Sequence, residues 1–275
     1  MARVPLIALN LCLDTCTSLE TRKMSQSLNG KVAIVTGGSR GIGAGIVKEL
    51  AKHGAAVAFT YLSSAKAQLL LSELRGSGTK AIAIQADGAD AAASAKTVVK
   101  ETVAAFGKID IIVNNAGNGD NHSLSDVTEE AFNRVFHINL LFPLLLVQES
   151  VPHLQQKARI VNVGSITGRI AYPEAILYAA SKAGLDSVTR SLAFTLGRQF
   201  EATVNTINPG PVATEMWEQT PQNGEIQKSL YCRTAAGDRI ASVEDIAPIV
   251  AFLCEEQSRW VTGNVTCANG GLLMI

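Results

Sequence analysis

The sequence has little charge, few aromatic side chains and no basic cluster. Charged residues make up 17% of the 275 and aromatic residues 5%, and the 24 Lys and Arg balance the 24 Asp and Glu. A neutral chain of this kind lacks the electrostatic footprint of a nucleic-acid-binding protein. The five cysteines have no metal-ligand spacing, and an odd, scattered set suits a reducing compartment. We therefore expect a cytoplasmic protein without a metal site.

Long apolar runs are also missing. The most apolar stretch, from Ile138 to Val147, is about half of the ~20 residues that a bilayer span needs. Asn139 and Pro143 interrupt it. This pattern predicts a buried helix and no membrane partner.

The start of the chain contains a short apolar run, from Met1 to Leu13, that imitates a signal peptide. The acidic Asp14 and the lack of a small-residue cleavage site argue against one. We expect residues 1–29 to be an extension that is disordered or dispensable. Residues 30–275 then form one catalytic domain.

Short β-branched runs alternate with helical stretches in this domain. Strands are predicted at 31–36, 56–61, 81–85, 109–113, 160–163, 203–207 and 264–267, with helices between them, including a long helical region at 128–154. Alternation of this kind predicts an α/β, doubly wound Rossmann sheet, mostly or wholly parallel, with helices on both faces. The least regular stretch, residues 211–238, contains Pro221, Gly224 and Gly237 and is predicted to be a mobile segment over a site.

The first predicted strand runs into a glycine-rich loop that opens a helix. Residues 36–43 read Thr-Gly-Gly-Ser-Arg-Gly-Ile-Gly. Glycines let a backbone turn tightly and approach a pyrophosphate, whose charge is stabilised at a helix N-terminus. A tight structural turn is the alternative, but the position after the first strand of an alternating chain favours a dinucleotide site.

The residues near the end of the second strand indicate which dinucleotide binds. An NAD-selective site places a carboxylate there for the ribose 2′-hydroxyl. No Asp or Glu occurs between Leu50 and Glu73, and the glycine loop carries Arg40, which can pair with a 2′-phosphate. Both observations predict NADP(H), although Arg40 can also be read as a solvated loop cation.

Tyr178 and Lys182 open a predicted helix one turn apart, so they share one face. An ammonium next to a phenol lowers the phenol pKa from its usual ~10. Tyr178 can then protonate a carbonyl oxygen while hydride reaches the carbon. Ser165 follows the fifth strand at the carboxyl edge of the sheet, where its hydroxyl can bind the same oxygen. Alone, the Tyr and Lys spacing would more often be a solvated helix face.

These motifs together resemble the short-chain dehydrogenase/reductase family, from Lys31 nearly to the C-terminus. The glycine loop, Asn-Asn-Ala-Gly at 114–117, Tyr-x-x-x-Lys at 178–182 and Pro-Gly at 209–210 stand in the family order. The resemblance implies the catalytic set Asn139, Ser165, Tyr178 and Lys182, with Asn139 holding a water that relays protons through Lys182. The loop and the resemblance together predict these cofactor contacts: Gly37, Ser39, Arg40, Gly41, Ile42, Gly43, Tyr61, Ser63, Asp87, Gly88, Asn115, Ala116, Gly117, Tyr178, Lys182, Pro209, Gly210, Val212 and Thr214.

The sequence favours an NADPH-dependent ketoreductase. The resemblance is closest to 3-oxoacyl thioester reductases and to fungal reductases of aromatic polyketides such as hydroxynaphthalenes, and the short tail after Gly270-Gly271 favours the second group. An aromatic ketone would need a flat apolar pocket, for which Ile166, Tyr172, Met216 and Trp217 are candidates, with His122 at its rim. The family also implies a homotetramer or homodimer through the helices that contain Asn139 and Tyr178. A secondary alcohol dehydrogenase and a catalytically silent NADP(H)-binding protein are the alternatives.

Overall fold

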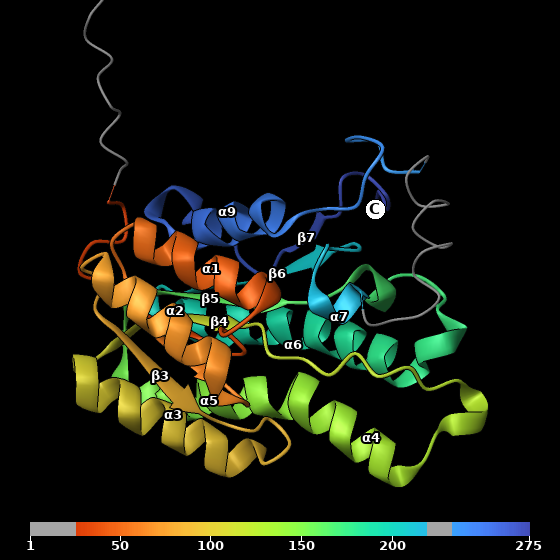
Figure 1. Ribbon diagram of the computed structural model, residues 1–275, viewed down its shortest axis with the longest axis horizontal. Helices are drawn as coiled ribbons and strands as arrows, with labels where there is room; N and C mark the ends of the chain where they lie inside the picture. The colour runs from red at the N-terminus through yellow and green to blue at the C-terminus, as the bar shows by residue number, and fades with distance from the viewer. Residues whose placement is uncertain (1–25, 219–232) are drawn as a thin grey trace, which may run out of the picture.

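A seven-stranded sheet forms the centre of the computed structural model, which describes residues 26–218 and 233–275 (Figure 1). Every pairing in it is parallel, and the strand order is β3-β2-β1-β4-β5-β6-β7. From β1 the chain adds β2 and β3 on one side and then crosses to add β4 to β7 on the other side. The position between β1 and β4 is therefore the switch point where doubly wound folds bind ligands. The strands are β1 (Val32–Val35), β2 (Ala56–Tyr61), β3 (Ala81–Gln85), β4 (Ile109–Asn114), β5 (Leu154–Val163), β6 (Thr203–Pro209) and β7 (Val265–Ala268).

Helices cover both faces of the sheet, which confirms the predicted doubly wound architecture (Figure 1). One layer contains α1 (Gly41–Lys52), α2 (Ser64–Gly76) and α9 (Val243–Cys254). The other contains α3 (Ala91–Phe106), α5 (Phe142–Ser150) and α6 (Ile176–Phe200). Two short helices, α4 (Glu129–Phe136) and α7 (Glu215–Glu218), lie nearer the carboxyl edge of the strands.

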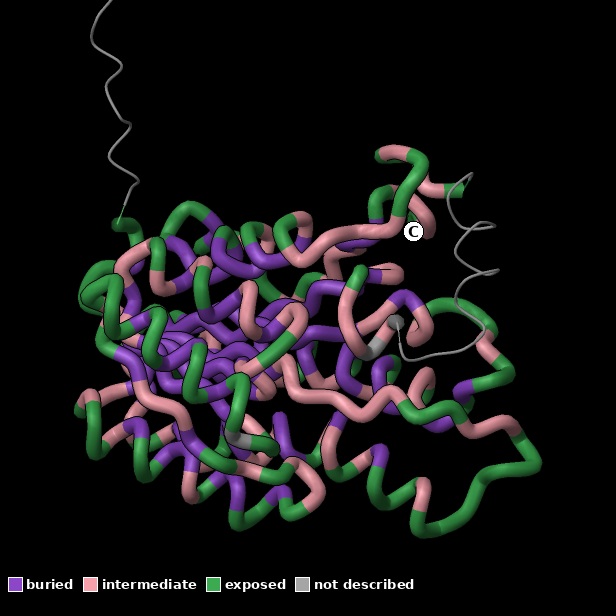
Figure 2. The backbone as a smooth tube through the Cα atoms, viewed as in Figure 1, coloured by how far each residue is buried: buried purple, intermediate pink, exposed green. Residues whose placement is uncertain are grey.

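The core is split between the two faces because side chains alternate along each strand. Ala33 and Val35 of β1 pack with the α1 layer, whereas Ile34 packs with the α3 layer. All three are fully buried, and Figure 2 shows the central strands as the buried interior. Continuous apolar strands are therefore required, because a parallel sheet covered on both faces has no solvent side.

The long helical region predicted at 128–154 is interrupted. A π-helical turn, His137–Leu141, joins α4 to α5, and β5 begins at Leu154, six residues before the predicted start. Pro143 is tolerated because it lies in the first turn of α5, where its missing N–H costs little. Single π turns often mark functional sites, and this one holds Asn139, which is 1% exposed.

The helical run Glu129–His153 is long and apolar enough, by length and composition, to cross a membrane. The apolar run identified in the sequence, from Ile138 to Val147, covers only ten of these residues, so a helix of this length was not predicted. The most apolar window of the run is 39% buried within the chain, with Val135, Phe142 and Leu146 fully covered. Core helices of globular proteins pass the same test.

The folded part of the chain begins earlier than residue 30. Leu28 is 1% exposed, and its N–H donates to the His53 carbonyl over 3.0 Å. The Ser27 hydroxyl donates to Glu255 over 2.8 Å. The last residues assigned to the extension therefore pack against the domain. Residues 1–25, and 219–232 of the segment predicted to be mobile, lie outside the described residues.

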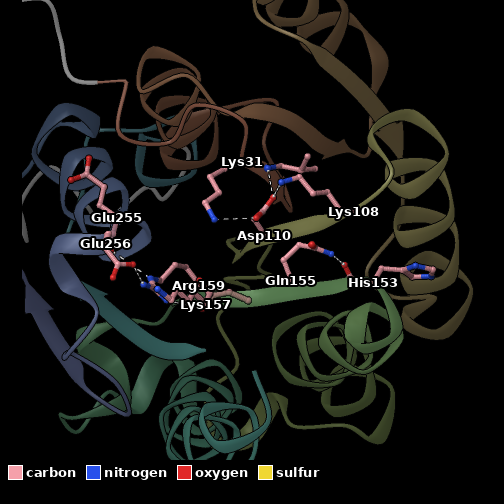
Figure 3. A network of polar contacts seen from close by, with 11 residues as sticks. Lys31, Lys108, Asp110, His153, Gln155, Lys157, Arg159, Glu255 and Glu256 are labelled. Carbon is pink, nitrogen blue, oxygen red and sulfur yellow. Dashed lines mark hydrogen bonds and ion pairs between the residues drawn. The ribbon is translucent and has the colours of Figure 1, made fainter. Parts of the chain in front are cut away.

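Buried charges gather at the amino edge of the strands, opposite the catalytic edge (Figure 3). Asp110, 3% exposed, accepts a hydrogen bond from the Val32 N–H over 2.9 Å and pairs with Lys31 and Lys108. Arg159 pairs with Glu256 over 3.0 Å and donates to main-chain carbonyls. Burial lowers the pKa of Arg159. The Asp110 pairs connect the starts of β1 and β4, and the Arg159 pair connects β5 to the residues after α9. A buried charge is stabilised only when it is paired in this way.

Replacing Asp110 with Asn is expected to lower the free energy of unfolding by about 1–3 kcal/mol, because Val32 and two lysines lose a charged partner. Urea denaturation with an unchanged m-value measures this loss. Glu73→Gln is the control: its ion pair with Lys48 is more than half exposed and is worth less than about 1 kcal/mol. Equal, small losses in both variants would contradict a buried ionic brace at Asp110.

Candidate active site

The glycine loop and other predicted site residues, Ser165 among them, follow the carboxyl ends of neighbouring strands, at one edge of the sheet. Thr36 follows β1, Asn115 follows β4, Ser165 lies just after β5, and Pro209 ends β6. These strands are consecutive in the sheet order β1-β4-β5-β6. Their carboxyl ends therefore place the glycine loop beside the residues predicted to be catalytic.

The glycine loop requires glycine at several positions. Gly37 and Gly41 have φ values of 62° and 52°, the left-handed region that glycine adopts without strain. A Cβ on Gly43 would stand 2.2 Å from the Gly37 carbonyl oxygen, and one on Gly38 would stand 2.6 Å from the Phe59 Cβ. Glycine at these two positions therefore lets the loop pack tightly on itself and on β2.

The Asn-Asn-Ala-Gly segment holds this loop in place. The Asn115 side chain donates to the carbonyls of Thr36 and Gly37 over 2.9 and 3.1 Å. The Thr36 hydroxyl accepts from the N–H groups of Asn115 and Ala116, each at 3.0 Å. The Thr60 hydroxyl accepts from the Gly37 N–H over 2.8 Å. Thr36 belongs to the predicted loop, but its bracing role was not predicted, and neither was Thr60, because both roles appear only when the strand ends are side by side.

The start of α1 fits a dinucleotide phosphate. Arg40 stands at its N-cap without a side-chain capping bond, and the first turn contains no acidic residue. Unsatisfied N–H groups at a helix start attract an anion. The loop, the bare glycines and this helix start together fit the pyrophosphate of NADP(H).

The predicted adenosine contacts surround the ends of β2 and β3. Tyr61 ends β2, and Ser63 is exposed at the start of α2. The exposed Asp87 uses its carboxylate to accept from the Ala89 N–H over 2.9 Å. A Cβ on Gly88 would stand 3.2 Å from Phe142, so this turn packs on the helix that follows Asn139.

Two charged residues that the sequence did not predict stand at the same end. Glu215, the first residue of α7, has its carboxylate 3.9 Å from the Arg40 guanidinium and also pairs with Lys66 in the first turn of α2. Lys66 had a weak signal, as a cation soon after β2. Glu215 had none, because it lies 149 residues after Lys66 in an irregular stretch.

The stretch after β6 contacts the glycine loop. Its base is fixed by main-chain bonds between Ala213 and Ala241 and between Ala241 and Pro211. Val212 is buried, and a Cβ on Gly41 would be 3.4 Å from the Thr214 methyl group. The predicted contacts Pro209, Gly210, Val212 and Thr214 therefore all lie on the segment that faces the loop.

Lys182 is buried between Tyr178 and Gly117. Its ammonium donates to the Val163 carbonyl over 2.8 Å and lies 5.6 Å from the centre of the Tyr178 ring. A Cβ on Gly117 would be 3.5 Å from the Lys182 Nζ, an ordinary contact distance, so the Asn-Asn-Ala-Gly segment lies beside the lysine. Burial lowers the pKa of Lys182 to about 8, although the Asp186 charge opposes the fall.

The predicted net fall of the Tyr178 pKa does not occur in this structure. Burial raises the pKa of Tyr178, a side-chain hydrogen bond with Ser165 lowers it in part, and Tyr172 adds a further rise. Tyr178 is therefore protonated near neutral pH, which is the form that can donate a proton.

Ser165 presents its hydroxyl toward Tyr178 from a capping position. Its Oγ accepts from the Thr167 N–H over 3.2 Å and from the Thr167 hydroxyl over 2.9 Å. Two incoming donors leave the Ser165 proton to be donated elsewhere, and Tyr178 is its neighbour.

Asn139 braces the site through its side chain. Its Oδ1 accepts from the Asn118 N–H over 2.7 Å, and its Nδ2 donates to the Asn118 carbonyl and the Ser181 hydroxyl. Ser181 in turn donates to the Tyr178 carbonyl over 2.7 Å. The amide hydrogens are thus committed to fixing the loop after Gly117 and the first turn of α6.

A buried carboxylate lies one turn behind Lys182, and sequence reasoning missed it. Asp186, 3% exposed, accepts from Arg169 over 2.9 Å and from Asn208 over 3.2 Å. Its other oxygen has no hydrogen-bond partner among the residues described. Its spacing of four residues after Lys182 on the same helix was the available signal.

The candidate substrate residues lie around the start of α6. The His122 carbonyl accepts from the Ile176 N–H over 3.1 Å, and the His122 Nδ1 is buried without a hydrogen-bond partner among the described residues. Burial raises the pKa of Tyr172. Ile166 is buried and Trp217 is partly buried, whereas the Met216 side chain lies outside what the structure describes.

Comparison with known proteins places this arrangement in a family. The family model described as Enoyl-(Acyl carrier protein) reductase matches residues 37–273. The short-chain dehydrogenase/reductase FrzI of a Cladobotryum species is 46% identical over 255 residues, covering 90% of this chain and 98% of FrzI. Hydroxynaphthalene reductase arp2 of Aspergillus fumigatus is 36% identical over 262 residues, covering 91% and 93%.

Solved structures are similar over the same length. A blue fluorescent protein from a metagenomic library, in complex with NADPH, is 40% identical with a TM-score of 0.84, covering 90% of this chain and all of that one. A short-chain dehydrogenase of Burkholderia cenocepacia, in complex with NADP, is 39% identical with a TM-score of 0.83, covering 90% and 99%.

The fold and the site define a Rossmann-type oxidoreductase. The chain belongs to the short-chain dehydrogenase/reductase family, which confirms the resemblance that its motifs carry.

Asp186→Asn is expected to lower the Lys182 pKa below about 8, because a nearby negative charge that favours the ammonium is lost. A lower pKa deprotonates Lys182 at lower pH, so the fall of kcat/KM with rising pH should begin earlier. Asp186→Glu keeps the charge and should restore the limb. A uniform loss of kcat/KM at every pH, without a shifted limb, would contradict an electrostatic role.

Proposed function

We propose that this protein reduces a ketone to a secondary alcohol with NADPH. The observation that carries the proposal is the grouping of Tyr178, Ser165 and Lys182 beside the glycine loop, with the Tyr178 pKa raised by burial. A protonated phenol suits carbonyl reduction, whereas alcohol oxidation begins with a base. This is why reduction is favoured over an alcohol dehydrogenase running in the oxidative direction.

NADP(H) is the cofactor that the cations favour. Two solved relatives about 40% identical hold NADPH or NADP, and Arg40 and Lys66 supply positive charge near the end of β2. The proposed contacts of the phosphates and nicotinamide are the loop 37–43, the segment 115–117 and the residues after β6. When bound, NADPH supplies the hydride.

The side chains then manage one proton. Tyr178 donates its hydroxyl proton to the substrate oxygen, while the Ser165 hydroxyl donates a hydrogen bond to that oxygen. The phenolate left on Tyr178 is stabilised by the Lys182 ammonium. Lys182, with a pKa of about 8, passes a proton back, and Asn139 keeps the loop and α6 in register.

We propose an aromatic, polyketide-type ketone as the substrate class. Ile166 follows Ser165 and Tyr172 interacts with Tyr178, so both supply apolar or aromatic surface at the site, and a fungal relative carries the name hydroxynaphthalene reductase. The family model's description favours a second candidate, an acyl thioester. The neutral composition offers no basic face for an acidic carrier protein.

We also propose a homodimer or homotetramer through α4, α5 and α6. Phe132, Leu141 and Phe194 are 43%, 37% and 67% exposed on this side. Apolar surface of this kind is usually covered by a partner. A catalytically silent binding protein is disfavoured, because Asn139, Ser165, Tyr178 and Lys182 are all present and grouped.

Tyr178→Phe should lower kcat for ketone reduction by about 10²–10⁴-fold, because the general acid is removed. NADPH binding, followed by quenching or transfer of fluorescence, should be nearly unchanged, which separates lost chemistry from lost folding. Wild-type turnover in this variant would contradict the assigned proton donor.

A substrate panel tests the proposed class. NADPH oxidation should be faster with flat aromatic ketones and hydroxynaphthalenones than with 3-oxoacyl thioesters of matched concentration. Faster thioester turnover would instead support the acyl substrate. No oxidation with any ketone, despite tight NADPH binding, would favour the silent binding protein.

A further inference from the structure

Three charged side chains from distant segments meet at the predicted 2′-phosphate end of the cofactor site. Arg40 belongs to the glycine loop, Lys66 to the first turn of α2 and Glu215 to the first residue of α7. The Glu215 carboxylate lies 3.9 Å from the Arg40 Nη1, and its other oxygen pairs with the Lys66 Nζ. The two cations therefore share one internal anion.

The position of this anion is set by both neighbours. Arg40 immediately precedes the helix start that fits the pyrophosphate, and Lys66 lies just beyond the end of β2. In dinucleotide folds the adenosine ribose lies at that strand end. Thr214, next to Glu215, also contacts Gly41 of the loop. The carboxylate consequently stands where a ribose phosphate would find its cations.

A carboxylate and a phosphate make the same demands on these cations. Both accept charge-assisted hydrogen bonds from guanidinium and ammonium groups. Lys66 lowers the pKa of Glu215, so Glu215 is ionised at neutral pH. Two anions cannot share the pair without repulsion, and the glutamate must move away when the phosphate arrives.

We propose that Glu215 occupies the 2′-phosphate position in the cofactor-free protein and acts as an internal competitor of NADP(H), with Lys66 as a second 2′-phosphate-binding residue beside Arg40. The proposal rests on the proposed NADP(H) dependence and adds how its strength is set. NAD(H) has no 2′-phosphate, so its binding leaves the Glu215 ion pairs in place.

The expected effect is modest because the pairs are exposed. The side chains of Arg40, Lys66 and Glu215 are 59%, 53% and 44% exposed, and surface ion pairs are weak and screened by salt. Removing the competitor should therefore tighten NADPH binding by about three- to tenfold.

Glu215→Gln keeps the shape of the side chain and removes its charge. Dissociation constants of NADPH, NADH and 2′,5′-ADP are measured by calorimetry at low and high salt. NADPH and 2′,5′-ADP should bind about three- to tenfold more tightly at low salt, NADH should be unchanged, and the gain should shrink as salt rises. Lys66→Ala should weaken NADPH and 2′,5′-ADP but not NADH.

Glu73→Gln is the control, because it removes the charge of another exposed, ion-paired acid, on α2; it should change no dissociation constant. If the wild-type protein prefers NADPH but Glu215→Gln binds NADPH no more tightly than the wild type, the competitor role is overturned and the proposed cofactor stands. Weaker NADH binding would show that Glu215 binds a ribose hydroxyl and would also overturn it. A wild-type protein without preference for NADPH would instead reject the proposed cofactor.

Discussion

The close approach of the β1 and β4 ends is the constraint on which the rest of the site depends. Thr36 and Asn115 bind each other's main chains across this switch point. Their bonds hold Gly37 in a conformation that no other residue adopts easily. The same four-residue segment continues to Gly117, which lies beside Lys182, so the residues that hold the glycine loop also border this lysine.

The catalytic side chains are placed by packing and tuned by burial. Burial disfavours the charged form of each group, so it raises the Tyr178 pKa and lowers that of Lys182. The two pKa values therefore shift in opposite directions. Ser165 and Asp186 moderate the shifts, one by a hydrogen bond and one by charge. In the proposed mechanism, burial suits Tyr178 to donate a proton and Lys182 to return one.

Local motifs made most of this site predictable. The glycine loop, Tyr178, Lys182 and Ser165 depend on spacing within one turn or one strand end, which the sequence displays directly. The seven strands followed from β-branched runs, and their parallel order from the helices between them. The π turn was not predictable, since nothing in residues 137–141 breaks the helical pattern. Glu215 and the Thr36 brace depend on contacts between distant segments, which the periodicity of the sequence does not report. Asp186 had the spacing of four from Lys182 as a signal, but its partners Arg169 and Asn208 come from other segments.

The residues proposed to set cofactor selectivity also include one from a distant segment. Selectivity was inferred from the lack of an acid between Leu50 and Glu73, yet the fold brings Glu215 to that position from beyond β6. An acid near the ribose therefore does not by itself indicate NAD(H), because its partners decide its meaning. Arg40 and Lys66 pair with the Glu215 carboxylate here. In the proposed competition, a phosphate binds these cations more strongly than the carboxylate does, because it has greater charge and additional oxygens. The buried Asp186 differs, since Lys182 and Arg169 hold it away from solvent and salt. Glu215 and Asp186 each lie beside two cationic groups, but the Glu215 pairs face water and are screened by salt, whereas Asp186 is buried.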